Sequence, residues 1–369
     1  MRWKSTISVL ASLGLFGALQ GVTGLAASGQ TLTIGVDHID AANQNFAAGR
    51  VFGYNDFFSR AVTVHSGDTL DFKTAFGFHI LSMTTDVAAA RQALPLAVLD
   101  TDDPNAVGSG APKIQLGPAF FASSGPPACG APGSPPCDFT GATLPPAGVN
   151  GGNDWFVHVN AAPGTYHYFC FLHPGMEGTL RVVDSPQPTT TQAVIDEMAQ
   201  GQFASDRSQA LDAEAAASVP TFSGGAPGTR TYQVNVGLTV AKNHVTLFEM
   251  LPSSLALAPG DSVRYAWGTV EAHSVTFPGT LDLPPFRPDF EAPDPADSGF
   301  EFIVDPGNAP NGTILSNSAA AVDSGLLVGS AYGLQPSAQS WSVGTASAGA
   351  YTYHCILHDW MQGTLNVSN

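Results

Sequence analysis

The sequence predicts an all-β protein built from two β-sandwich domains joined by a partly helical linker. The 369-residue chain contains 40 glycines and 28 prolines, and short alternating runs such as residues 60–64 and 69–72 are typical of strands joined by tight turns. The same set of motifs occurs in both halves of the chain. This internal repeat indicates that the sandwich itself is present twice.

The first 27 residues have the layout of a secretory signal peptide. Arg2 and Lys4 precede an apolar run from Ile7 to Leu19, and small residues follow. A membrane anchor is the alternative, but the run is shorter than the ~20 residues that span a bilayer, and no second such run occurs in the sequence. We therefore expect a secreted or periplasmic protein without a membrane span.

The charge balance is strongly acidic. Lys and Arg number 13 against 30 Asp and Glu, a formal net charge of −17. Such a surface repels nucleic acid and anionic lipid, which argues against both as partners. It would suit a basic protein partner or a salty environment, although an acidic surface more often serves only solubility.

The composition divides the chain into three parts after the signal. We expect a first domain over residues 28–184, a linker over 185–228 and a second domain over 229–369. The linker opens and closes with runs rich in Pro, Thr, Gly and Ser. Its middle, residues 192–217, is rich in Ala, Glu and Asp and predicts one or two short helices resting on a domain, with disorder as the alternative.

Each half also contains a long insertion, residues 84–153 in the first and 279–339 in the second. Loops this long are uncommon without a role or local structure of their own. Cys129 and Cys137 lie inside the first insertion in a Pro- and Gly-rich stretch. Export favours oxidation, so we expect a disulfide between them, and a pair of metal ligands is the alternative.

The most informative repeat is a loop of the form Cys-x2-His-x2-Met. It is preceded in each half by a Gly-Asp turn with a histidine 11 or 12 residues after the aspartate, and it is followed by a strand-like run. The predicted metal ligands are His79, Cys170, His173 and Met176 in the first half and His273, Cys355, His358 and Met361 in the second.

This set of side chains has the composition of a type 1, or blue, copper site. Two imidazoles and a thiolate bind in a plane, and a thioether is a weak axial ligand. Zinc is the alternative metal, but structural zinc sites usually close with a fourth Cys or His. Each residue alone would more often be core or surface filler, whereas four ligand types in one order, twice in one chain, favour a metal site.

The motif Gly-x-Tyr-x-Tyr-x-Cys-x2-His, present at residues 164–173 and 349–358, resembles the cupredoxin family. It is similar to plastocyanin and, in the two-residue gap before Met, to amicyanin. The resemblance implies a Greek-key β-sandwich for each half with copper near one end, two coppers per chain, and transfer of single electrons to and from a redox protein partner. It also implies that electrons pass through His173 and His358, which have apolar neighbours.

Two fused domains of this kind also occur in copper nitrite reductases and small laccases, so an enzyme with a further copper at an interface is the alternative function. His354, directly before Cys355, favours it, whereas Phe169 stands at the matching place in the first half. No His-x-His pair occurs, and five other histidines do not recur at matching positions: His38, His65, His158, His167 and His244. A copper-holding protein is a third class, but the chain has only 6 Met and 4 Cys. The sequence therefore favours an electron carrier over an enzyme.

Overall fold

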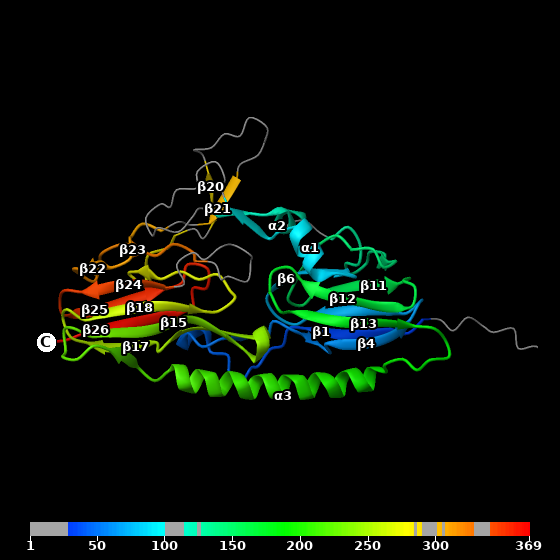
Figure 1. Cartoon of the computed structure of the whole chain (residues 1–369), viewed down its shortest axis with the longest axis horizontal. Helices are drawn as coiled ribbons and strands as arrows, with labels where there is room; N and C mark the ends of the chain where they lie inside the picture. The colour runs from blue at the N-terminus through cyan, green and yellow to red at the C-terminus, as the bar shows by residue number, and fades with distance from the viewer. Residues whose placement is uncertain are drawn as a thin grey trace, which may run out of the picture.

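The computed structural model describes residues 29–99, 114–123, 127–283, 286–289, 301–304, 307–327 and 340–369. The predicted signal peptide, residues 1–27, lies outside the described residues. Within the described part the chain is nearly all-β, and two β-sandwiches lie side by side (Figure 1). The predicted fold class is confirmed. Among the described helices, none is long and apolar enough to cross a membrane.

The first sandwich consists of two five-stranded sheets. One contains, in spatial order, β3 (Phe57–Phe58), β1 (Thr31–Val36), β5 (Thr69–Thr74), β11 (Asp154–Val159) and β9 (Cys137–Phe139). The other contains β10 (Ala147–Asn150), β6 (Phe78–Thr84), β12 (Gly164–Cys170), β13 (Glu177–Val183) and β4 (Ala61–His65). Many neighbouring strands are not consecutive in the chain, because the chain crosses repeatedly between the sheets, as in a Greek key.

The second sandwich repeats this plan. Its larger sheet contains β2 (Phe52–Gly53), β16 (Val245–Leu251), β15 (Thr231–Val240), β18 (Ser262–Gly268), β24 (Ser340–Thr345) and β22 (Thr313–Leu315), with β14 (Thr221–Ser223) beside β15. Its other sheet contains β17 (Ser254–Leu257), β26 (Gln362–Val367), β25 (Gly349–His354), β19 (Thr276–Phe277) and β23 (Val322–Asp323).

Alternation of side chains places the core between the sheets of each sandwich. Along β1 the buried residues are Leu32, Ile34 and Val36, and polar or smaller residues alternate with them. A strand has a two-residue period, so such a run presents one face to the core. The repeat runs in phase, because Thr31 pairs with Thr69 after the first Gly-Asp turn and Thr231 pairs with Ser262 after the second.

The predicted Gly-Asp turns hold the start of each sheet through a buried carboxylate. Asp68 accepts hydrogen bonds from the backbone N–H groups of Gln30 and His65, each at 2.9 Å. Asp261 does the same for three backbone N–H groups, at 2.8 to 2.9 Å: those of Gly228, Arg230 and Ala258. The aspartate thus satisfies donors that the turn leaves without strand partners.

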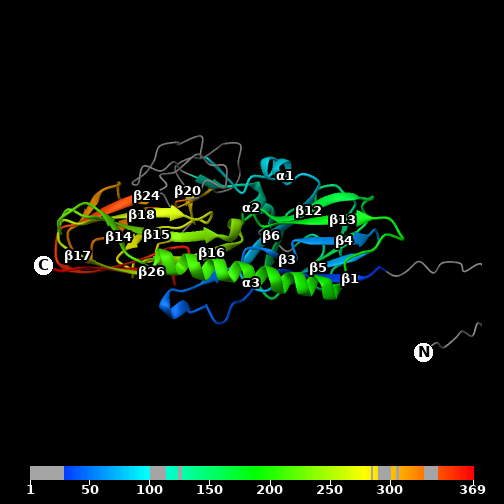
Figure 2. The same ribbon diagram turned by 60° about the horizontal axis from the view of Figure 1, so that its bottom comes forward.

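The linker contains one long helix, α3 (Gln192–Ala217), which differs from the short helices predicted on one domain. It begins at the N-cap Thr191, whose side chain accepts from the N–H of Val194. Figures 1 and 2 show it running along both sandwiches. Ile195 packs into the first core, and Ala210 packs in a cluster with residues of the second. Anchors at both ends favour a single continuous helix.

A segment of the N-terminal half also reaches the second sandwich. Strand β2 pairs with β16, and Phe52 and Tyr54 pack with Leu247 and Leu251 in one buried cluster. Asn55 donates a hydrogen bond from Nδ2 to Oε1 of Glu271, 3.0 Å away, and both residues are buried. The two sandwiches therefore share a packed interface.

The two long insertions meet each other at the other side of this interface. The first contributes α1 (Val87–Ala93), β7 (Ala97–Leu99), β8 (Ile114–Leu116) and α2 (Pro118–Ser123), and the second contributes β20 (Phe286–Asp289) and β21 (Glu301–Val304). These strands form a small sheet in the order β20-β21-β8-β7. The insertions thus have local structure of their own and add a connection between the sandwiches (Figure 1).

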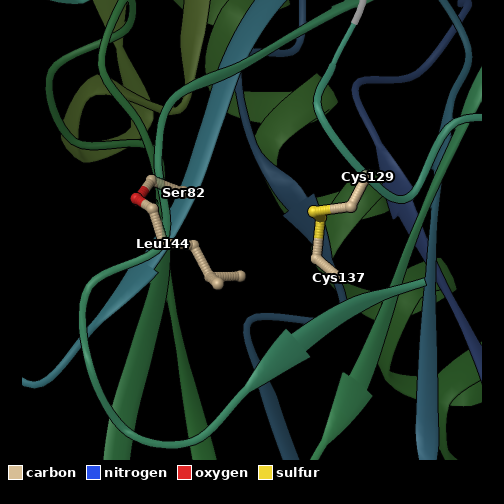
Figure 3. Close-up of a disulfide and its surroundings, with 4 residues drawn as sticks. All are labelled: Ser82, Cys129, Cys137 and Leu144. Atoms are coloured by element: carbon tan, nitrogen blue, oxygen red, sulfur yellow. A yellow bond between two sulfur atoms is a disulfide. The ribbon is translucent and has the colours of Figure 1, made fainter. Parts of the chain in front are cut away.

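The rest of the first insertion lies against its own sandwich. Cys129 and Cys137 form the predicted disulfide, with a sulfur–sulfur distance of 2.08 Å. Figure 3 shows this bridge together with Ser82 and Leu144. Ser82 Oγ donates a 2.7 Å hydrogen bond to the carbonyl of Leu144. These contacts attach the segment to strands β6 and β11, and its residues Phe139 and Leu144 are buried in the core of the first sandwich.

Candidate metal centres

Each sandwich brings one upstream histidine to the Cys-x2-His-x2-Met loop at its end. In the first, Cys170 Sγ lies 3.5 Å from Nδ1 of His173 and 3.9 Å from Nδ1 of His79. His79 comes from β6, and Cys170 ends the neighbouring strand β12. Strand pairing therefore positions two of the ligands, and the short loop supplies the third.

The second sandwich repeats this arrangement with a tighter imidazole pair. Cys355 Sγ lies 3.8 Å from Nδ1 of His273 and 3.7 Å from Nδ1 of His358. The two Nδ1 atoms are 3.1 Å apart. Among the described residues, the groups of at least three His, Cys, Asp or Glu that could share a metal ion are these two clusters.

Both loops are closed by matching backbone hydrogen bonds. The N–H of Cys170 donates to the carbonyl of Met176, and the corresponding bond joins Cys355 to Met361, at 3.1 and 3.0 Å. Both methionine side chains are fully buried. Each thiol sulfur also accepts an N–H at 3.4 Å, from Ile80 in the first site and Ser274 in the second. The loop is thus preorganised with its methionine turned into the core.

The ligand atoms have spacings that suit a single metal ion. Typical bonds of about 2.0 Å to imidazole nitrogen and about 2.3 Å to thiolate sulfur, at angles of 100–120°, separate nitrogen from sulfur by about 3.3–3.8 Å. The four nitrogen–sulfur separations run from 3.5 to 3.9 Å. Two nitrogens on one metal at an angle of about 100° would be about 3.1 Å apart, which is the value at the second site.

The electrostatics of the first site favour a thiolate. Burial alone would raise the pKa of the Cys170 thiol, but His173 and then His79 hold that pKa well below its usual value. Burial likewise opposes charge on His79, yet its hydrogen bonds to Asp37 and Cys170 raise its pKa to about 10. The first site therefore stabilises a thiolate with positive charge beside it. A metal cation bound to the thiolate would produce the same distribution of charge.

The second site favours neutral groups. Burial raises the pKa of the Cys355 thiol, with partial opposition from nearby N–H donors. Burial, followed by His358, holds the pKa of His273 well below its usual value. For His358, burial lowers the pKa to about 4, Asp359 opposes the shift, and His173 of the other site adds to it. The charges of the two sites thus influence each other.

One structurally equivalent position explains much of this difference. Asp37 directly follows β1, and Gly237 lies inside β15 at its register shift, each at the same spacing after the first strand pair, Thr31 with Thr69 or Thr231 with Ser262. Both have a left-handed backbone, with φ of 60° and 68°. Asp37 Oδ2 lies 3.5 Å from Nε2 of His79, and both side chains are buried. At Gly237 an added Cβ would lie only 2.5 Å from Nε2 of His273, so a side chain does not fit.

The two sites face one cavity between the sandwiches, with a volume of about 370 Å³. His79, His173 and His358 are among its lining residues, and most of the remaining wall is apolar. The insertions contribute Leu116 and Leu326 to this wall. The two long insertions, for which the sequence indicates no role, therefore border the cavity between the sites.

Aromatic rings also connect the sites along this interface. Trp360 packs on His358 with ring centroids 5.4 Å apart, and Phe46 packs on Trp360 at 5.2 Å. Phe46 then lies 6.3 Å from Phe76, whose carbonyl is 3.2 Å from Nε2 of His79. Successive contacts of 3.2 to 6.3 Å thus lead from His358 to His79.

The histidines that are not proposed as ligands lie outside the two clusters. Those without a matching repeat position have separate neighbours: His38 packs on Phe203, His65 on the Gln187 carbonyl, His158 beside Asp138, His167 beside Glu177 and His244 beside Asp56. His354 is buried, and its Nδ1 has no hydrogen-bond partner within the described part of the chain. The described lining of the cavity does not include it.

Sequence reasoning missed Asp37, Gly237 and Arg91. Arg91 of α1 donates to the carbonyls of Cys170 and Phe171, at 2.6 and 3.3 Å, and so secures the first loop from the insertion. Asp37 and Gly237 could have been found by aligning residues 31–37 with 231–237, in phase with the Gly-Asp turns. Arg91 gives no such signal, because its contact depends on the fold of the insertion.

No protein-family model matches this chain, and no curated protein does. Among solved structures, a mutant plastocyanin of fern is 22% identical, covering 37% of this chain and 99% of its own, with a TM-score of 0.21. Auracyanin B is 19% identical over 42% of this chain and 89% of its own, with a TM-score of 0.22. A Cu-containing nitrite reductase (NirK) from Thermus scotoductus SA-01 is 12% identical over 92% of this chain and 68% of its own, with a TM-score of 0.23. Similarity this weak says nothing about metal or activity, so both must be argued from the residues of this chain.

Proposed function

We propose that this chain is a secreted electron-transfer protein that holds one type 1 copper ion in each sandwich. His79, Cys170, His173 and Met176 would hold the first ion, and His273, Cys355, His358 and Met361 the second. Bound copper supplies one-electron chemistry between Cu(II) and Cu(I). The protein's part is to bind the ion, exclude water and present an imidazole edge through which a redox partner is reached.

One observation carries this proposal: the same His2Cys cluster, with a buried methionine on the same loop, occurs in each sandwich, fully buried in the first and buried except for the half-buried His358 in the second. Thiolate and thioether suit Cu(I), and imidazole suits both oxidation states. A methionine in the fourth ligand's place speaks against structural zinc. Because packing and loop hydrogen bonds hold the ligands already, little rearrangement is needed when the ion's charge changes.

The test is a copper count and a visible absorption spectrum of Cu(II)-loaded protein, on wild type and on Cys170→Ser and Cys355→Ser. We expect two coppers per chain and a thiolate-to-copper band that falls by about half in each variant. The matched control is the double variant Cys129→Ser/Cys137→Ser, which removes two cysteines away from the sites and should keep the full band. Absence of the band in wild type would contradict the proposal.

A second candidate function, oxidation of a small organic molecule by the copper sites, is favoured by the cavity that both ligand sets border. Its volume of about 370 Å³ falls in the range of small-molecule sites. This candidate function includes the copper oxidoreductase considered above, in which a further copper ion would lie at an interface. Here we expect the rate of copper reduction by hydroquinone to saturate with concentration, and Leu116→Trp, which fills the cavity, to slow it. A strictly linear dependence would favour the simple carrier.

A further inference from the structure

The two candidate sites have the same ligand set but different surroundings at the upstream histidine. In the first site Nδ1 of His79 faces the cysteine sulfur, so Nε2 is left to carry the proton and to donate. Its possible acceptors are the Phe76 carbonyl at 3.2 Å and Oδ2 of Asp37 at 3.5 Å. Asp37 is held for this role, because its Oδ1 accepts the backbone N–H groups of His38 and Tyr54, at 2.5 and 3.1 Å.

In the second site the equivalent atom has no such partner. Nε2 of His273 is buried and makes no hydrogen bond to any residue that the structure describes. The backbone of Gly237 occupies the equivalent place, and an added Cβ would lie 2.5 Å from that nitrogen. The chain thus excludes a carboxylate here by sterics.

A buried carboxylate beside a ligating imidazole acts in a known direction. It makes the imidazole a stronger donor, and its negative charge stabilises the more positive state of the bound ion. The low polarity of the surroundings strengthens that interaction. A ligand whose second nitrogen has no acceptor lacks this stabilisation and favours the less positive state instead.

We propose that Asp37 sets the two copper sites apart, so that the first has the lower reduction potential and a half-reduced chain carries its electron at the second. This inference rests on the proposed two-copper function and adds the direction of electron transfer, from the first site to the second. Both ligand sets border one cavity, and a path of aromatic rings leads from His358 to Phe76, whose carbonyl lies beside His79. We therefore treat the two coppers as a pair that exchanges electrons. An electron that reaches either site would therefore reside mainly at the second, as Cu(I) held by the ligand set of Cys355.

The test is a spectroelectrochemical titration of full-length, copper-loaded chains that keep one site each. Cys355→Ser reports the first site and Cys170→Ser the second. We expect the second site to hold its electron at least tenfold more favourably, which is 59 mV for a one-electron couple. Asp37→Asn, added to Cys355→Ser, should raise the first potential, and Asp37→Gly should raise it further by making the site resemble the second.

Two controls separate this effect from a general one. Asp37→Asn added to Cys170→Ser should leave the second potential unchanged. Asp71→Asn removes one carboxylate from the same sandwich, where Asp71 accepts from Thr33 at 3.2 Å, and should leave both potentials unchanged. Two blue coppers with equal or reversed potentials, or no shift with Asp37→Asn, would overturn the inference and leave the two-copper function intact. A chain that takes up no copper would overturn both.

Discussion

The two sandwiches have the same Cys-x2-His-x2-Met loop but differ in the residue that lies beside the upstream histidine. Both have the cysteine at the end of a strand, the closing hydrogen bond to methionine and an N–H donor to the sulfur. In the first sandwich Asp37 lies beside the upstream histidine, His79, whereas in the second Gly237 lies beside His273. The comparison teaches that repeated ligands do not make equivalent sites, because neighbouring groups decide which charge state is stabilised.

A second difference lies immediately before each cysteine. Phe169 is fully buried and packs on Phe171, in a cluster that also includes Ala90 of α1 and Ala119 of α2. His354, at the same place in the second sandwich, is buried without a hydrogen-bond partner for Nδ1 among described residues. The first sandwich thus uses its insertion as an apolar cover, whereas the second keeps a polar ring there.

The largest effect that we expect comes from the paired turn carboxylates. Asp261→Ala should lower the free energy of unfolding by about 4 kcal/mol, because three backbone N–H groups lose their buried acceptor. Asp68→Ala, which removes the acceptor of two such groups, should cost less. Denaturant titration followed by tryptophan fluorescence measures both. Each Asp→Asn variant keeps one acceptor oxygen and should be milder; equal losses for Ala and Asn would contradict this account.

The next effect is a pH dependence at Glu249 of β16, a buried carboxyl. Burial, with help from Glu214 and against Arg50, raises its pKa to about 8. A carboxyl whose folded pKa exceeds its unfolded value stabilises the fold below pH 4.5 or so and loses that contribution as the pH rises through about 8. We expect the free energy of unfolding to fall on the order of 3 kcal/mol between pH 5 and 9, and Glu249→Gln to flatten the curve. An unchanged slope in that variant would assign the dependence to another group.

The axial methionines should give a smaller effect. Met176→Leu and Met361→Leu should each keep copper and raise the reduction potential of their own site, because loss of the thioether favours Cu(I). A shift of about 60 mV would be tenfold in the one-electron equilibrium. Titration in the single-site variants measures it, and a lowered potential would contradict the axial assignment.

The smallest effect is expected at His354. His354→Phe copies the first sandwich at this position and should leave the copper count at two, if the four proposed ligands suffice. Metal analysis with the visible spectrum checks this. Loss of a colourless copper in this variant would instead support the oxidoreductase.

Much of the site could be read from residues close together in the chain. Cys170, His173 and Met176 span one loop, so their convergence is a local property. The histidines His79 and His273 were predicted through the in-phase Gly-Asp turns, and the strand pairing of β6 with β12 explains why the first reaches its cysteine. The all-β class and the disulfide were likewise open to prediction, because alternation and cysteine spacing are local signals.

What the sequence by itself determined is therefore the repeated sandwich and the two predicted ligand sets. The tertiary structure decided the rest: that α3 is one helix along both sandwiches, that the insertions pair across the interface, and that both sites border one cavity. It also decided that Asp37 stands beside His79 while Gly237 leaves no room beside His273. Alternation and spacing act over a few residues, whereas these features depend on how surfaces distant in the chain pack, and packing is set by shape and burial of the whole fold.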